Sequence, residues 1–423
     1  MKKKISVLLV VAMLAMMLAS AALADNQLTI AWWGNQTRNE RTQAALDLYS
    51  EQNAGVTFDP QMNAWSDYWA ALATASAGGS LPDVIQMDYQ YLSQYVDNNL
   101  LVDLTPYMEN GTLDMSKVNE GIVGSGSKDG GVYAVCLGVN APALLYNKTL
   151  LDANGITVKD NMTLDEFFAV SKEVYEKTGY KTNIGYGTDN VFNYVLRGLG
   201  HSLFTDGQLS ATQEDAEYFF GLYEKGIKEG WHVSSAIFAE VTVGSVEQDP
   251  MIYGSDPANM SWCAFFWSNQ LTAMQNAAPE GVEIGITTWP SADPAASNYL
   301  KPSQFFSVSA QGSQQEEAVK VVNFFLNSVE CNGILLAERG IPAASDVAEA
   351  VAPKLDANNQ KVISFINDVV SPNSSAVPAA DPTASAEVYA LVDEIIESLC
   401  YGTISASDAA AYFMDEATAI MNR

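Results

Sequence analysis

Eight tryptophans are the residues of this sequence whose chemistry is most specific. They stand at positions 32, 33, 65, 69, 231, 262, 267 and 289. A sugar has hydroxyl groups at its ring edges and apolar C–H faces, so a sugar site needs flat aromatic rings beside carboxylate, amide or guanidinium groups. Trp33, Trp65 and Trp267 have polar neighbours of this kind. The pattern predicts a tryptophan-lined site for carbohydrate.

The first group of candidate ligand-binding residues lies near the beginning of the chain. Trp33 ends a predicted strand, and Asn35 and Arg38 stand at the start of the following helix. Asp88 and Tyr89 follow a second predicted strand. Ligands of open α/β sheets gather at the carboxyl ends of strands, so we expect these side chains to contact the ligand. Asp88 has an alternative interpretation as the cap of the next helix.

Trp65 lies in the polar turn 63–67, where it is either an aromatic platform or a packing residue. Trp69 follows one turn later on a predicted helix, and Trp32 points to the opposite face of its strand from Trp33. We expect Trp69 and Trp32 to belong to the core.

The second group of candidates comes from the later part of the chain. Trp267 and Asn269 follow an apolar segment and are predicted to stack on and hydrogen-bond the ligand. Trp289 precedes Pro290 and is a further candidate, with hinge packing as the alternative. Arg339 begins the turn Arg339–Pro342 and either binds ligand or forms an ion pair that holds the turn. For an acidic sugar, the candidate cations are Arg38, Lys301 and Arg339.

Sequence motifs of catalysis are missing. The chain has no phosphate-binding glycine loop, no G-x-S-x-G, no H-E-x-x-H and no dinucleotide fingerprint, and its two histidines are His201 and His232. We therefore predict no enzyme activity, no metal and no cofactor. A secreted glycoside hydrolase is one alternative, although no pair of carboxylates is singled out. A receptor for a cationic solute such as a polyamine is another, because the formal net charge is −29.

The N-terminal residues 1–24 are predicted to be a secretory signal peptide. Three lysines, Lys2 to Lys4, precede a mostly apolar run, and small residues end the segment at Ala24. No later run is long enough and apolar enough to cross a membrane. The protein is thus expected outside the cytoplasm, without the lipobox cysteine that would anchor it to lipid. Its acidity disfavours nucleic acid as a partner.

The four cysteines, Cys136, Cys263, Cys331 and Cys400, are widely spaced and form no C-x-x-C pair. A chain of this length does not need disulfides to build a core, so we favour buried thiols, with one or two disulfides as the alternative.

The elements that must position these residues alternate between strand and helix. Predicted strands cover 27–33, 56–58 and 83–87, and helices cover 38–53, 67–77 and 91–98, which is typical of a parallel α/β sheet. A second α/β region follows two apolar runs near 131–147. Its predicted elements are helices over 163–178 and 212–229, strands over 183–187, 283–290 and 305–309, and an aromatic strand or loop over 259–267. A helix to 328, capped by Ser313 and Glu316, and closing helices over 386–400 and 406–422 complete the chain.

Six short motifs in this order resemble family 1 extracellular solute-binding proteins of carbohydrate ABC transporters, the group that includes maltose-binding protein. Each motif is weak alone, and Cys136 stands where the family usually has proline. The motifs are Leu81–Asp88, Leu101–Tyr107, Gly131–Cys136 with Leu145–Lys148, Thr163–Phe167, Arg339–Pro342 and Tyr401–Ala410.

The resemblance implies a two-lobe periplasmic-binding-protein fold of type II, with several crossings between the lobes and the ligand cleft between them. Carried onto this chain, the N-terminal lobe is 25–137 plus 290–340, and the C-terminal lobe is 141–289 plus 341–423. The implied function is capture of a sugar by hinge closure and its delivery to the permease subunits of an ABC importer. The sugar is expected to be an oligosaccharide, with a pectin-derived one as a specific possibility, and the protein is expected to be a monomer.

Overall fold

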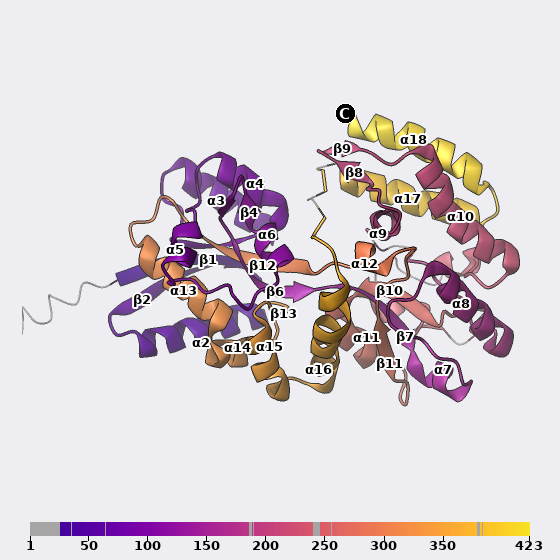
Figure 1. Cartoon of the computed structure of the whole chain (residues 1–423), viewed down its shortest axis with the longest axis horizontal. Coiled ribbons are helices and arrows are strands. Elements are labelled where there is room, and N and C mark those ends of the chain that lie inside the picture. Colours follow the sequence, from indigo (N-terminus) through magenta and orange to yellow (C-terminus); the bar gives the residue numbers. More distant parts are fainter. Residues whose placement is uncertain are drawn as a thin grey trace, which may run out of the picture. The chain divides into compact units, whose positions relative to one another are not determined.

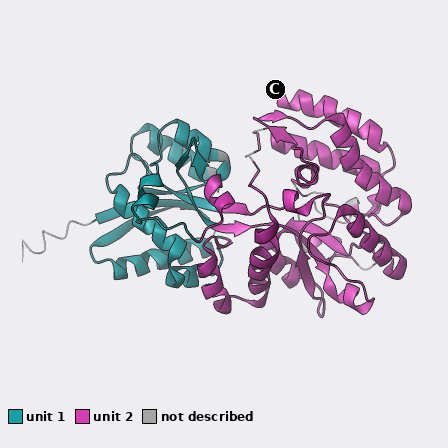
Figure 2. Cartoon of the chain, in the orientation of Figure 1, with its two compact units in different colours: residues 1–116, 126–137, 304–339 teal, residues 117–125, 138–303, 340–423 magenta. Residues whose placement is uncertain are grey.

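The computed structural model describes residues 26–34, 36–63, 65–185, 188, 190–239, 246–254, 256–378, 381–382 and 384–423. The chain forms two compact units, shown in different colours in Figure 2. Unit 1 comprises Met1–Ser116, Gly126–Leu137 and Gln304–Arg339, and unit 2 comprises Lys117–Ser125, Gly138–Ser303 and Gly340–Arg423. The predicted signal peptide, Asn35 and the side chain of Trp65 lie outside the described residues.

Unit 1 is built on a mixed sheet whose strands follow the order β2-β1-β3-β12-β6. Strand β1 runs parallel to β2 and to β3, whereas β12 runs antiparallel to β3. Every residue of β3 is buried, because helices cover both faces of the sheet: α3 and α4 lie on one face, and α2, α13 and α14 on the other (Figure 1). The bounds are β1 Asn26–Trp33, α2 Gln36–Gln52, β2 Val56–Asn63, α3 Trp65–Ala77, β3 Val84–Met87, α4 Tyr89–Asp97, α5 Thr105–Glu109, β4 Ser127–Lys128, β5 Gly131–Val132, β6 Val135–Asn140, β12 Lys301–Val308, α13 Gln315–Asn327 and α14 Val329–Leu335.

A pair of side chains fixes the register of β1 against β3. Asp83 Oδ2 accepts hydrogen bonds from the backbone N–H and the hydroxyl of Thr29, both at 2.8 Å, and the Asp83 N–H donates to Thr29 Oγ1 at 2.9 Å. Because the two strands are parallel, their carboxyl ends lie at the same edge of the sheet. Trp33 and the residues after Met87 are thereby held at that edge.

Unit 2 combines an antiparallel sheet, in the order β10-β7-β11, with a layer of packed helices. Helix α10 packs against α17 and α18, and a large aromatic core lies beneath them. The bounds are α6 Glu120–Ser125, β7 Pro142–Asn147, α7 Lys148–Ala153, α8 Leu164–Thr178, α9 Val191–Arg197, β8 Phe204–Thr205, β9 Gln208–Leu209, α10 Gln213–Glu229, β10 Cys263–Trp267, α11 Leu271–Ala277, β11 Ile284–Thr287, α12 Pro294–Ser297, β13 Ile341–Pro342, α15 Ser345–Val351, α16 Ala357–Ser364 with a π-helix Phe365–Val370, α17 Ser385–Cys400 and α18 Ala406–Met421.

Most predicted elements are present within one to three residues of the expected ends, and Thr163 and Glu166 form the predicted capping box of α8. Two predictions were wrong. Helix α13 begins after Gln314 rather than under a Ser313 cap, because the Gln314 side chain donates to the carbonyl of Gln27 at 2.9 Å. Residues 183–185 form no strand, since the Asn183 N–H donates to the hydroxyl of Ser261 instead of to a neighbouring strand.

The chain returns to unit 1 at Gln304, whereas the motifs placed that boundary at 290. Trp289 belongs to the core of unit 2, which keeps the segment that follows it in that unit. The chain first enters unit 2 for the short segment Lys117–Ser125 and enters it again after Leu137, the residue at which the motifs end the N-terminal lobe.

The four cysteines are free thiols. Burial raises the pKa of Cys263 and Cys331 well above the usual thiol range, and it raises the pKa of Cys400 to about 12. These thiols are therefore protonated at neutral pH and poor nucleophiles. Among the described helices, none has the length and apolar character of a membrane span.

Candidate functional site

The carboxyl edge of the unit 1 sheet carries a group of four aromatic side chains from three different elements. Trp33 at the end of β1 lies 5.2 Å from the Tyr68 ring and 5.6 Å from the Trp69 ring, measured between centroids. Trp69 on α3 stacks on Tyr91 of α4 at 3.8 Å with an interplanar angle of 23°. We call Trp33, Tyr68, Trp69 and Tyr91 the unit 1 aromatic group. Three of them are only partly buried, which leaves aromatic surface for a ligand.

Tyr68 anchors this group to the sheet. It is fully buried, and its hydroxyl lies 2.7 Å from the Gln86 carbonyl oxygen, to which it donates. Burial raises the pKa of Tyr68 well above its usual value, so the hydroxyl keeps its proton. Trp69 was expected in the core; instead it is partly buried and its ring contacts all three other members of the group, because Tyr68 takes the buried position one residue earlier on α3.

Asp88 and Tyr89 follow β3, as the sequence predicted, and both are partly buried. The Asp88 carbonyl accepts from the N–H groups of Tyr91 and Leu92, each at 3.1 Å, so Asp88 begins the first turn of α4. The Tyr89 ring stacks on Phe305 of β12 at 6.4 Å. Both residues stay candidates for ligand contact at the same edge as Trp33.

Arg38 is tied into the scaffold of unit 1. Its Nε lies 2.9 and 3.1 Å from the two carboxylate oxygens of Glu338, and its Nη1 donates to the Trp33 carbonyl at 3.2 Å. The side chain crosses Gly34 so closely that a β-carbon there would lie 2.4 Å from Arg38 Cδ, which explains the glycine. Glu338 thus neutralises the cation next to Trp33.

Arg339 lies inside unit 1 and is only 2% exposed. Its guanidinium donates to the amide oxygens of Gln86 and Gln304, at 2.5 and 2.9 Å, and to the Thr42 hydroxyl at 2.8 Å. Burial, followed by the nearby Arg38 charge, lowers the pKa of Arg339 to about 9. This position favours a role in holding the helix–strand core and gives a ligand no access to the group.

Unit 2 presents one partly buried tryptophan with a cation on its face. Trp267 ends β10, and Lys301 Nζ lies 4.1 Å from the centroid of its ring. Beneath it, the rings of Trp289 and Tyr299 lie at 5.7 and 6.4 Å. We call Trp267 and Lys301 the unit 2 stacking pair. Lys301 and Asn269 are both exposed, and Asn269 follows Trp267 by two residues.

Trp289 packs against the ring of Trp267 from the interior of unit 2. Its side chain is 0% exposed, and it packs edge-to-face on Tyr194 at 5.1 Å. The packing alternative therefore describes its position better than contact with a ligand. Asn35 and the side chain of Trp65 lie outside the described residues, so their predicted roles stay predictions.

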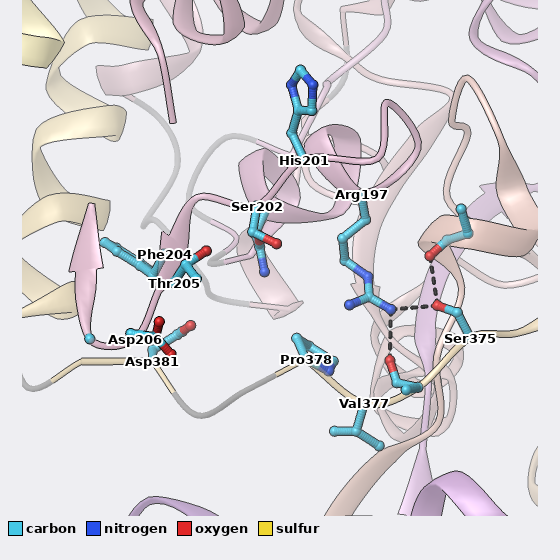
Figure 3. A pocket seen from close by; sticks show the side chains of 14 residues that line it. Arg197, His201, Ser202, Phe204, Thr205, Asp206, Ser375, Val377, Pro378 and Asp381 are labelled. Carbon is cyan, nitrogen blue, oxygen red and sulfur yellow. Dashed lines mark hydrogen bonds between the residues drawn. The ribbon is translucent and has the colours of Figure 1, made fainter. Parts of the chain in front are cut away.

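A further feature of unit 2 has no counterpart in the sequence predictions. A cavity of about 490 Å³ opens between α9, the β8–β9 hairpin, residues 375–378 and Asp381, and Arg197 lies in its wall (Figure 3). The segments that line it are far apart in the sequence, so residue spacing gave no sign of it. Among the described residues, no group of three or more His, Cys, Asp or Glu side chains is arranged to hold a metal ion.

Comparison with known proteins links this architecture to one group. The family described as bacterial extracellular solute-binding protein matches residues 44–361. The solved structure of an extracellular solute-binding protein family 1 member from Alicyclobacillus acidocaldarius is similar with a TM-score of 0.85, at 22% identity, over 94% of this chain and 98% of that one. The α/β class and the two-lobe fold expected from the motifs are thereby confirmed.

Two other similar proteins have names that state a ligand. A periplasmic oligogalacturonide binding protein from Yersinia enterocolitica is similar with a TM-score of 0.76, at 18% identity, over 94% of this chain and 99% of that one. An arabinooligosaccharide-binding protein from Halalkalibacterium halodurans is 25% identical over 157 residues, which are 36% of this chain and 35% of that protein.

Proposed function

Because this chain belongs to the bacterial extracellular solute-binding proteins, we propose that it captures an oligosaccharide outside the cytoplasm and delivers it to the permease of an ABC importer. The observation that carries the proposal is the unit 2 stacking pair. The indole is partly buried, and a sugar ring that stacks on the face under Lys301 would displace the ammonium group, which could then meet a charged or hydroxylated edge of the same sugar.

The proposed ligand is acidic. Of the three cations that the sequence offered, Arg38 is paired with Glu338 and Arg339 is buried among amides. Lys301 is the exposed one, and it lies on an aromatic ring. A hexuronate residue of a pectin-derived oligosaccharide combines an apolar ring face with a carboxylate, and it matches this pair of side chains.

The unit 1 aromatic group supports the same function with different chemistry. Trp33, Trp69 and Tyr91 offer ring faces, with Asp88 nearby in the chain as an acceptor for sugar hydroxyls. We propose that both units contact one oligosaccharide and that its binding favours a closed form over an open one. The two similar proteins named for oligosaccharides are consistent with this ligand class.

Calorimetry with the mature protein tests the proposal. Oligogalacturonides should bind more tightly than malto-oligosaccharides of equal length, and binding should change the tryptophan fluorescence. Trp231→Phe is the matched control, because Trp231 is a buried tryptophan of unit 2 and lies in the core. Absence of binding by every oligosaccharide would remove the carbohydrate assignment. Binding of spermidine in place of sugars would support a receptor for cationic solutes.

A further inference from the structure

The cavity beside α9 has the size of a binding site for a small molecule. Its volume of about 490 Å³ lies within the usual range for such sites. Figure 3 shows Arg197 on one side, with Ser202, Phe204 and Thr205 from the segment that follows α9 and Val377 and Pro378 from residues 375–378. All the lining residues belong to unit 2.

Arg197 is held in place by neutral partners on one side of its guanidinium. Nη2 donates to Ser375 Oγ at 2.5 Å and to the Ala376 carbonyl at 2.7 Å, and Nε lies 3.4 Å from the Ser297 carbonyl. The guanidinium carbon also lies 5.2 Å from the centroid of the Tyr299 ring. The group is therefore ordered before any ligand arrives, which lowers the entropic cost of binding.

The charge of Arg197 has no ion pair with a described carboxylate, in contrast to Arg38 with Glu338. Burial lowers the pKa of Arg197, which means that the surroundings oppose its positive charge. An anion against the guanidinium would offset that cost and add a charge-assisted hydrogen bond.

Carboxylates elsewhere in the lining restrict which anion fits. Asp206 lies at the turn between β8 and β9, and Asp381 accepts a hydrogen bond from the Tyr389 hydroxyl at 2.8 Å. Two negative groups disfavour a doubly charged ligand such as phosphate. They favour a singly charged one that carries hydroxyl donors, and the partly buried Phe204 ring adds an apolar wall.

We propose that this cavity is a separate binding site for a small sugar acid, whose carboxylate pairs with Arg197 and whose hydroxyl groups donate to Asp381. Trp267 and Lys301 do not line it. The proposal rests on the proposed function only for the choice of a carbohydrate as the ligand class.

Calorimetry of the mature protein with D-galacturonate, D-galactose and inorganic phosphate tests this site. Galacturonate should bind at least about tenfold more tightly than galactose or phosphate, and Arg197→Gln should remove that preference. Arg197→Lys should keep part of it. The matched control is Arg423→Gln, because Arg423 is an exposed arginine with a surface ion pair to Glu387, and it should change nothing.

Three results would overturn the proposal: galacturonate binding that Arg197→Gln leaves intact, equal binding of phosphate, or loss of galacturonate binding in Trp267→Ala. If Arg197→Gln unfolds the protein, Ser202→Phe is used in its place, because it retains Arg197 and fills the cavity. Undiminished galacturonate binding by Ser202→Phe also overturns the proposal. The two proposals can fail separately. If oligosaccharide binding depends on Trp267 and not on Arg197, the proposed function is upheld. If only galacturonate binds, and its binding depends on Arg197, only the cavity site is upheld.

Discussion

The two units differ in the surroundings of the cationic side chains that lie near their tryptophans. In unit 1, Arg38 beside Trp33 is paired with Glu338, and Arg339 is buried among amides and a hydroxyl. In unit 2, Lys301 lies exposed over the ring of Trp267. The cations of unit 1 therefore hold its scaffold together, whereas Lys301 is exposed and is the cation that we propose contacts the ligand.

This difference predicts that the two units contribute differently to the affinity and to the selectivity of ligand binding. An aromatic surface whose neighbouring charge is neutralised stacks on any sugar ring and selects little. A cation on an aromatic face distinguishes an acidic sugar from a neutral one. We therefore expect affinity to depend on both units and selectivity for charge to depend on unit 2.

The largest effect is expected from Arg339→Ala. The substitution removes a buried side chain and leaves the amide oxygens of Gln86 and Gln304 without their donor, which should lower the free energy of unfolding by about 3 kcal/mol. Chemical denaturation measures the change, and Arg423→Ala on the surface is the control. An unchanged unfolding free energy, together with a selective loss of affinity for uronic ligands, would show that Arg339 binds ligand and would break the comparison.

Trp267→Ala should have the next largest effect, this time on binding. Removal of the stacking ring should weaken oligosaccharide binding by about 30-fold, or about 2 kcal/mol, with a small change in stability. Calorimetry checks it against Trp231→Phe. Wild-type affinity in Trp267→Ala would exclude the unit 2 stacking pair from the site.

Lys301→Gln should sharpen the comparison by separating two ligand classes. Affinity for oligogalacturonides should fall about tenfold, because the charge-assisted bond is lost, while affinity for neutral oligosaccharides should change less than about twofold. The two titrations are run on the same protein preparation. Equal losses for both classes would mean that Lys301 serves only to cover Trp267.

The smallest effect is expected from Arg38→Gln. The ion pair with Glu338 is partly buried, so its loss should lower the unfolding free energy by about 1 kcal/mol. Affinities for acidic and neutral sugars should change by the same factor. Glu338→Gln and the double variant complete a cycle that isolates the pair. A preferential loss for acidic sugars in Arg38→Gln would contradict the scaffold role.

Local patterns were sufficient to predict part of the elements of both units. The alternation of strand and helix over 27–98 and the Thr163–Glu166 capping box depend on residues that are close in sequence, and the structure has them as expected. The failures arose where a distant group decided the outcome. The Gln314 side chain, at the start of α13, donates to the distant Gln27 carbonyl, and the Ser261 hydroxyl accepts from the Asn183 N–H.

The predicted roles of the site residues show the same limit. Arg339 stands in an exposed-looking turn motif, but its partners Thr42, Gln86 and Gln304 come from three other segments, so spacing could not reveal its burial. Trp69 and Tyr91 stack although they belong to different helices. For the proposed carbohydrate site, the sequence placed Trp33 correctly at the end of its strand, and Trp267 is likewise the last residue of β10.

The interrupted path of the chain through unit 1 has a consequence for the order of folding. Strand β12 pairs with β3, and helices α13 and α14 pack against α2, so this unit needs residues up to Arg339. Domains usually fold in the order in which they are synthesised, from the N-terminus onward. Here unit 1, whose synthesis begins first, cannot complete its fold until most of unit 2 has been synthesised. During that interval β3 has an open edge where β12 will pair, and the new chain is most exposed to aggregation then.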